Sequence, residues 1–279
     1  MRWPAVVCAL VLGTAPALPR THAEDDPEPA AAAIVERALE RARWADEQGF
    51  ESRYACRLLS GVEEEGGERR TRLYALVRID GRPFYRLLEV DGGALDADEQ
   101  VRQRKREETF REQVAAGRAP EADSPEDDDD ENLRFDEDLV SRYDARLLGR
   151  DVVEGRPAWV FAYQPKLGRL PEKRRIEKLL NRSRGRIWFD AETYEVARLE
   201  FELVETVRFL WFLGSVSELS GHYVRRPVDG VWLPGEGEMT IRARRLLSSI
   251  QRRHTAAWSD YAPFPAEPQG RPVPAATAH

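Results

Sequence analysis

The stretch GRIWFDAETYEVARLEFEL, residues 185–203, decides the fold because apolar and charged side chains alternate on one side of a short turn. Ile187 to Asp190 predicts a strand, Ala191 to Tyr194 a turn, and the residues that follow a second strand. In the second strand one face carries only apolar side chains and the other carries only charged ones: Ala197, Leu199, Phe201 and Leu203 against Arg198, Glu200 and Glu202. A period of two with one charged face predicts an antiparallel sheet that packs on one side.

The same period extends in both directions from this hairpin. Upstream it predicts strands over 54–60, 72–79, 84–90, 145–153 and 158–163. Downstream it predicts strands over 206–214, 219–226, 238–247 and 250–258. Two-residue turns are expected at Asp80-Gly81, Glu154-Gly155 and Asp229-Gly230. The whole pattern indicates one antiparallel sheet of about ten strands.

Helical periodicity interrupts the strands in three places. From Ala30 to about Gln48 the apolar residues recur on one face, and Gly49 suits a C-cap. Residues 96–116 also have helical spacing, but their apolar stripe is thin and predicts a charged helix lying across a surface. A third, short helix is expected around 172–181. The predicted fold class is therefore α+β, a sheet with an N-terminal helix and an inserted charged helix.

The first 23 residues have the features of a secretory signal peptide. Arg2 gives a positive start, residues 4–18 are mostly apolar, and Ala23 ends a sequence that a signal peptidase reads, so cleavage is expected after Ala23. The apolar run is too short to span a bilayer. Val7 precedes Cys8 and most of the apolar run follows it, which argues against a lipoprotein site. We therefore expect a periplasmic protein with no transmembrane span in its mature chain.

Residues 24–261 are predicted to form a single domain, and the Pro-rich segment 262–279 a disordered tail. Within the domain, residues 117–132 hold eight acids and predict a flexible loop. Calcium binding is the alternative, although consecutive Asp residues lack the ligand spacing of a calcium loop. Cys56 alternates with apolar neighbours on a strand, which predicts a buried thiol.

Composition and motifs exclude several classes of function. The net charge is -7 with 33% charged residues, while seven Trp, ten Phe and eight Tyr suffice for a core. This balance argues against nucleic-acid binding. Metal-ligand spacings, nucleophile elbows and phosphate-binding glycine loops are all missing from the sequence. We expect no enzyme, no cofactor and no metal site, and a secreted hydrolase with paired carboxylates is the remaining alternative.

Three segments carry a resemblance to a known family: Gly155 to Lys166 (GRPAWVFAYQPK), Gly185 to Phe201 (GRIWFDAETYEVARLEF) and Asp229 to Met239 (DGVWLPGEGEM). In these segments and in the order of its elements, the chain resembles the periplasmic lipoprotein-carrier superfamily. That superfamily includes LolA-like outer-membrane lipoprotein-sorting proteins, the LolB receptor and the lipid-sensing domain of MucB/RseB regulators. The resemblance implies a curved sheet in the form of an unclosed β-barrel around helices, with an apolar cavity for acyl chains.

Two sets of candidate site residues follow. The resemblance places an apolar, acyl-binding set on the strands that line such a cavity: Trp159, Phe161, Trp188, Leu199, Phe201 and Trp211. A second set lies in the segment 166–186, which holds nine Lys or Arg residues and two Glu. Its members are candidates for an anionic head group or a partner protein: Lys173, Arg174, Arg175 and Lys178.

The function that the resemblance implies is a soluble periplasmic protein that binds lipid or lipoprotein. It would take part in outer-membrane lipoprotein sorting or envelope maintenance. The alternative is an envelope-stress sensor or interaction module, similar to MucB/RseB, that binds an envelope protein partner through the basic segment.

Overall fold

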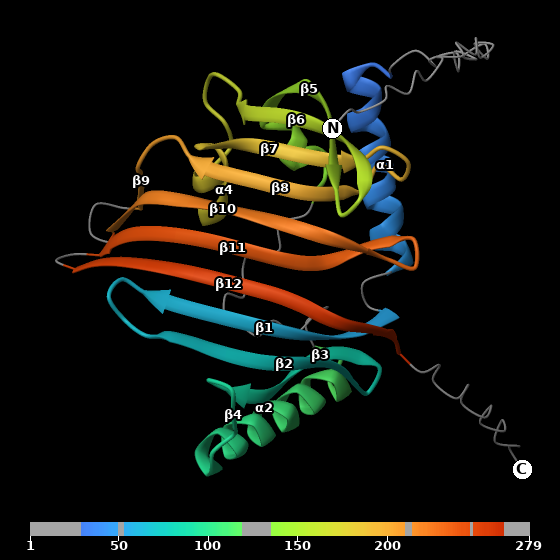
Figure 1. Cartoon of the computed structure of the whole chain (residues 1–279). Coiled ribbons are helices and arrows are strands. Elements are labelled where there is room, and N and C mark those ends of the chain that lie inside the picture. Colours follow the sequence, from blue (N-terminus) through green and yellow to red (C-terminus); the bar gives the residue numbers. More distant parts are fainter. Residues whose placement is uncertain (1–28, 50–52, 119–134, 210–213, 246–247, 265–279) are drawn as a thin grey trace, which may run out of the picture. The chain divides into compact units, whose positions relative to one another are not determined.

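The computed structural model describes residues 29–49, 53–118, 135–209, 214–245 and 248–264. In these residues twelve strands form one antiparallel sheet (Figure 1). The path across the sheet is β4-β3-β2-β1-β12-β11-β10-β8-β7-β6-β5, and β9 pairs with β10 beside it. Because the path begins and ends at edge strands, the sheet is unclosed, and the predicted α+β fold class is confirmed.

The elements follow the predicted order. The helices are α1 (Ala31–Gln48), α2 (Ala97–Ala115), α3 (Glu137–Ser141) and α4 (Arg175–Leu180). The first strands are β1 (Tyr54–Glu64), β2 (Arg69–Ile79), β3 (Arg82–Val90), β4 (Gly93–Ala94), β5 (Tyr143–Val153) and β6 (Arg156–Pro165). They are followed by β7 (Ser183–Asp190), β8 (Val196–Leu203), β9 (Val207–Phe209), β10 (Gly214–Val228), β11 (Val231–Arg245) and β12 (Ser248–Pro263).

The predicted two-residue turns join neighbouring strands. At Asp80-Gly81, between β2 and β3, both residues have positive φ (49° and 80°). At Asp229-Gly230, between β10 and β11, the values are 50° and 82°. This backbone twists in the same sense as the flanking strands, and glycine adopts it without steric cost. The turn signals in the sequence therefore set the hairpins.

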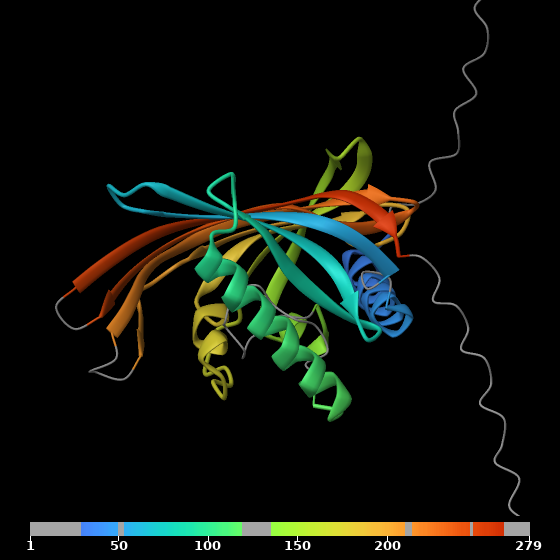
Figure 2. The same ribbon diagram turned by 90° about the horizontal axis from the view of Figure 1, so that it is seen from below.

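Helix α1 packs on one end of the sheet. Its buried residues Ile34 and Ala38 lie against Trp159 and Phe161 of β6 and Phe189 of β7. Seen from below, α1, α2 and α4 lie on the same side of the sheet (Figure 2). Within the described helices, none has the length and apolar content that a membrane crossing requires.

Helix α2 packs beside β3, whose outer side pairs with the two-residue strand β4 only at Glu89 and Val90. Its buried Phe110 contacts Phe84 and Ile79, with ring centroids of the two Phe 5.0 Å apart. The Gln103 Oε1 atom accepts a hydrogen bond from the Leu87 N–H, and Arg106 donates to the Tyr85 carbonyl at 2.6 Å. These contacts occupy backbone groups of β3 that a further strand would otherwise use, so the helix covers part of this edge.

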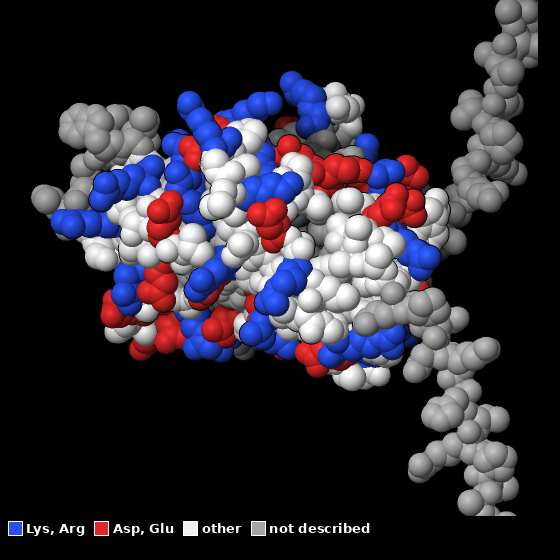
Figure 3. Space-filling view, turned by 90° about the horizontal axis from the view of Figure 1, so that it is seen from above, with Lys and Arg blue, Asp and Glu red and all other residues white. Residues whose placement is uncertain are grey.

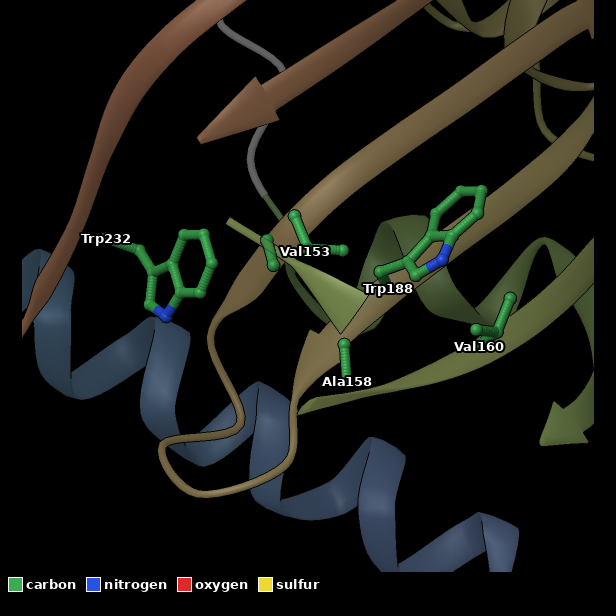
Figure 4. Packing of buried hydrophobic residues seen from close by; sticks show 6 residues of the cluster. Val153, Ala158, Val160, Trp188 and Trp232 are labelled. Carbon is green, nitrogen blue, oxygen red and sulfur yellow. The ribbon is translucent and has the colours of Figure 1, made fainter. Parts of the chain in front are cut away.

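A second buried cluster joins the β5–β8 part of the sheet to β11. Its members are Val153, Ala158, Val160, Trp188, Ala197 and Trp232, and five of them are labelled in Figure 4. Trp188 and Trp232 are 3% and 1% exposed, so both are core residues. Cys56 of β1 is also buried, as the strand alternation predicted.

The boundaries of several elements differ from the prediction. Strand β11 begins at Val231 rather than at 238, and β12 continues to Pro263, two residues into the segment assigned to the tail. These long hairpin strands contain proline, which has no N–H to donate within a sheet and therefore predicts the end of a strand when only the sequence is known. The short helix α3 was not predicted. The signal peptide, most of the acidic loop 117–132 and the tail beyond Phe264 lie outside the described residues.

Candidate functional site

One face of the sheet carries a row of apolar side chains that crosses several strands. Phe161 of β6 pairs with Ile187 of β7, which pairs with Leu199 of β8, which pairs with Tyr223 of β10. We call this the helix face, because α1 packs against it at Phe161. Phe161 is buried, whereas Ile187, Leu199 and Tyr223 are only half-buried. The row therefore starts as core under α1 and continues as a partly accessible apolar surface.

On the same face, three aromatic side chains lie beside glycines of the neighbouring strand. The register pairs are Tyr163 with Gly185, Phe201 with Gly221, and Tyr223 with Gly237. A Cβ atom at Gly221 would lie 2.8 Å from the Phe201 Cζ atom, and one at Gly237 would lie 3.3 Å from the Tyr223 Cδ2 atom.

The Tyr163 side chain passes over Gly185. A Cβ atom there would lie 2.8 Å from the Tyr163 hydroxyl, which donates a hydrogen bond to the Glu200 carbonyl at 3.0 Å, one strand further on. Burial raises the pKa of the Tyr163 hydroxyl. The missing side chains at the glycines leave room for the rings, which form a low, largely aromatic floor on the helix face.

Two polar side chains of β12 interrupt this apolar face. His254 and Trp258 alternate with outward-facing residues and lie beside Met239 and the Tyr223 ring, whose centroid is 6.0 Å from that of Trp258. In the part of the chain that the structure describes, the Trp258 Nε1 and His254 Nδ1 atoms are buried and make no hydrogen bond. A buried donor without a partner costs about 1–3 kcal/mol, so an acceptor there would be stabilising.

The six predicted acyl-binding residues do not form one surface. Trp159 and Phe161 are 3% and 1% exposed, packed beneath α1. Leu199 and Phe201 lie half-buried on the open part of the helix face. Trp188 alternates with Ile187 and so lies on the opposite face, while Trp211 lies outside the described residues.

The position of Trp188 is fixed by polar contacts on its own face. Its indole N–H donates to the Asp151 Oδ2 atom at 3.0 Å. The Arg198 guanidinium lies over the ring, 4.9 Å from its centroid. The hydrogen bond from Trp188 lowers the pKa of Asp151. These contacts give Trp188 a packing role on the opposite face from Leu199.

The basic segment 166–186 is held by an ion pair that the sequence did not reveal. Arg142, at the start of β5, lies 3.4 Å from the Glu177 carboxylate of α4, and their side chains are 3% and 5% exposed. Arg142 also donates to the Pro171 carbonyl and the Asn181 side chain, each at 3.0 Å. Burial alone would raise the pKa of Glu177, but hydrogen bonds from Lys173, Arg174 and the charge of Arg142 lower it overall.

The four basic candidate residues differ in the contacts that they make. The Arg174 guanidinium is paired with Glu177 at 3.2 Å, and the Lys173 backbone N–H donates to the same carboxylate at 2.6 Å. The Lys178 ammonium lies 6.0 Å from the centroid of the Phe209 ring. The side chains of Lys173 and Arg175 are exposed. Two of the four therefore point to solvent from a loop that Arg142 fixes in place.

Comparisons with known proteins bear on the fold. No protein-family model matches the chain, and no curated protein matches its sequence. Among solved structures, a DUF1329 family protein from Desulfovibrio piger is 14% identical, with 84% of this chain and 95% of that chain covered at a TM-score of 0.35. A LolA superfamily protein from Nitrosomonas europaea is 11% identical, with 86% and 96% covered, also at 0.35.

The complex of MucA and MucB from Pseudomonas aeruginosa also matches. Its matching chain is 14% identical, with 81% of this chain and 100% of that chain covered at a TM-score of 0.24. Identities and scores this low carry no inference about ligand or partner. They record a similarity only: this chain is similar to structures of the LolA superfamily and of MucB.

Proposed function

We propose that this chain is an exported protein that binds lipid or lipoprotein, holding acyl chains against the open part of its helix face. One observation supports the proposal above the others. Ile187, Leu199, Phe201 and Tyr223 form a contiguous apolar surface across three strands, yet they are only half-buried, although α1 packs beside them. A contiguous apolar surface that stays partly exposed marks a ligand or partner site, whereas a closed core would bury these side chains completely.

The shape of this surface suits an extended hydrocarbon. Because rings rest beside Gly185, Gly221 and Gly237, few side chains project from the floor to interrupt a flexible chain. The Trp258 Nε1–H group, which has no hydrogen-bond partner among the described residues, lies at the side of this floor and could donate to an ester or amide carbonyl. An acylated ligand carries both the hydrocarbon and such a carbonyl. We further propose that the protein takes part in outer-membrane lipoprotein sorting or envelope maintenance.

The test compares two neighbouring residues on opposite faces. The protein, purified from the cell envelope without detergent, is examined by native mass spectrometry and titrated with a fluorescent fatty acid. We expect co-purified lipid, weaker fatty-acid binding by Leu199→Gln, and unchanged binding by the control Glu200→Gln, which lies one residue away on the other face. Equal melting temperatures would show that both variants fold. If the purified protein carries no lipid and does not bind the fatty acid, the proposal is refuted.

The second candidate is a sensor or interaction module that binds an envelope protein. The observation that favours it is the rigidly anchored basic loop, from which Lys173 and Arg175 reach solvent. Neutralising both, as Lys173→Gln with Arg175→Gln, should reduce recovery of an acidic partner in a pull-down. The control is Arg72→Gln with Arg82→Gln, which removes equal charge from exposed positions of β2 and β3. Identical recovery by the two double variants would count against this surface.

A further inference from the structure

The face of the sheet opposite the helix face contains a broad trough. Its volume is about 870 Å³, and it crosses β5, β6, β7, β8, β10 and β11. The register places one row of its lining in the order Arg146, Ala162, Arg186, Glu200, His222, Glu238. None of these six residues belongs to the apolar row on the other face, although Tyr163, Gly185, Phe201 and Gly221 of the aromatic floor also line the trough.

One end of the trough is a pair of arginines with a small residue between them. Arg146 and Arg186 are both direct cross-strand neighbours of Ala162, on its two sides. Adjacent strands lie about 4.8 Å apart, so the two Arg backbones are about 10 Å apart across an alanine that leaves the space between them empty. Two long guanidinium side chains can converge on one oxyanion at that separation.

The charges of the other arginines in the trough are already balanced. Arg184 lies 2.7 Å from the Glu202 carboxylate, and Arg198 lies 2.5 Å from that of Glu200. By contrast, Arg146 and Arg186 are exposed and form no ion pair or hydrogen bond with any described residue. The unpaired arginines of the trough therefore flank Ala162, and Asp144, two residues from Arg146 on β5, also lines this end.

The rest of the lining accepts and donates hydrogen bonds. Glu202 of β8 pairs in register with Ser220 of β10, which pairs with Thr240 of β11, and all three line the trough. Glu238 lies further along, 2.6 Å from Arg253 outside the trough. Hydroxyl groups of a ligand could donate to these carboxylates and exchange hydrogen bonds with Ser220 and Thr240. A polyanion would be repelled by the same carboxylates.

We propose that the trough binds an acidic saccharide: Arg146 and Arg186 hold its single carboxylate or phosphate group, and Glu202 binds hydroxyls of the same sugar. Ser220 and Thr240, about 14 and 19 Å from Ala162 by the spacing of the strands, would bind hydroxyls of a further sugar ring. The volume is in the range of small-ligand sites, and the polar lining matches a polyhydroxylated ligand. Acidic and basic side chains are also interspersed on the side of the molecule that is seen from above (Figure 3).

The experiment titrates the mature protein by calorimetry with four probes: glucuronate, glucose 6-phosphate, glucose and inorganic phosphate. We expect both acidic sugars to bind at least about tenfold more tightly than glucose and than inorganic phosphate, since each lacks one of the two kinds of contact. The tighter of the two acidic sugars identifies the preferred anionic group. Equal affinity for all four probes, or no binding of either acidic sugar at millimolar concentration, would overturn the proposal.

Variants then locate the site. Arg146→Gln with Arg186→Gln should weaken binding of the acidic sugars at least about tenfold, because two charge-assisted contacts are lost. Arg72→Gln with Arg82→Gln removes the same charge outside the trough and should leave binding unchanged. Leu199→Gln should also leave it unchanged, so this result is independent of lipid binding. Equal weakening by both double variants would overturn the assignment, because only the net charge would then matter.

Discussion

Arg142 and Glu177 form an ion pair in which both side chains are almost completely shielded from solvent, at 3.4 Å. The pair connects Arg142, which lies between α3 and β5, to the short helix α4, 35 residues later in the chain. A helix of a single turn and a half gains little stability from its own hydrogen bonds, so its position depends on such contacts. The basic segment is therefore a structured part of the protein.

Removing one member of this pair should be strongly destabilising. Glu177→Gln removes the buried carboxylate and leaves Arg142 paired only with the exposed Asp138, 3.0 Å away. Loss of the buried partner of a buried charge costs up to about 3–5 kcal/mol. The matched control is Glu202→Gln, which breaks an exposed pair with Arg184 and should cost no more than about 1 kcal/mol. Urea unfolding measures both. A loss for Glu177→Gln no larger than that of the control would show that the pair does not hold the segment.

Gly185 should not tolerate a side chain. An alanine Cβ atom would lie 1.8 Å from the Glu200 carbonyl oxygen, so β7 and β8 would have to separate. We expect Gly185→Ala to lower the free energy of unfolding by about 1–3 kcal/mol or more, as overpacking does. Gly93→Ala is the control, because its nearest contact would be an ordinary 3.5 Å. Both are measured by thermal unfolding, and similar melting temperatures would contradict the close approach.

Stability should fall in acid because of Asp190. Its burial raises the carboxyl pKa, but hydrogen bonds from Arg156 and from the backbone of Thr193 and Glu192 lower the pKa further, so the net pKa is depressed. Asp190 therefore stabilises the fold above its unfolded pKa of about 3.9, and this contribution is lost as the pH falls through the lower folded pKa. Unfolding midpoints in urea between pH 6 and 2 measure the effect.

The comparison variant for this pH dependence is Asp190→Asn, which should be less stable at pH 6 and lose less stability on acidification. Glu65→Gln, at an exposed position, should reproduce the wild-type curve. If Asp190→Asn and the wild-type protein have parallel curves over this range, the ion pair with Arg156 does not contribute in the way that its 2.6 Å distance suggests.

The Cys56 thiol should be unreactive in the folded protein. It is 6% exposed on β1, so a thiol reagent reaches it only when the strand opens. We expect slow labelling in buffer and complete labelling in urea. Ser259→Cys, at an exposed position of the neighbouring strand β12, provides the control and should react rapidly in buffer. Fast labelling of the wild-type protein would mean that β1 separates readily from its neighbouring strands around Cys56.

The fold was largely predictable because its signals are local. Alternation over residues 197–203 identifies a one-sided strand, and Asp80-Gly81 fixes a hairpin whatever the rest of the chain does. The end of β12 was not predictable in this way. Strand length there depends on pairing with β1, as in Tyr54 with Pro263, and not on the propensity of the residues themselves.

The site was less predictable because it depends on register. Leu199 and Phe201 were among the candidates that the sequence suggested, but the sequence could not show that Trp188 lies on the other face and that Trp159 is packed under α1. The interior glycines Gly185 and Gly221 were a usable signal, since glycine inside a strand marks a close approach. Which aromatic residue lies beside each one became clear only from strand pairing.

The packing around Gly185 also limits which residues can stand there in related proteins. A side chain at position 185 would meet the Glu200 carbonyl oxygen and the Tyr163 hydroxyl, which donates to that oxygen. The collision with the backbone of β8 would remain whatever residue stood at position 163. Among descendants of a common ancestor, position 185 should therefore stay glycine even where position 163 changes.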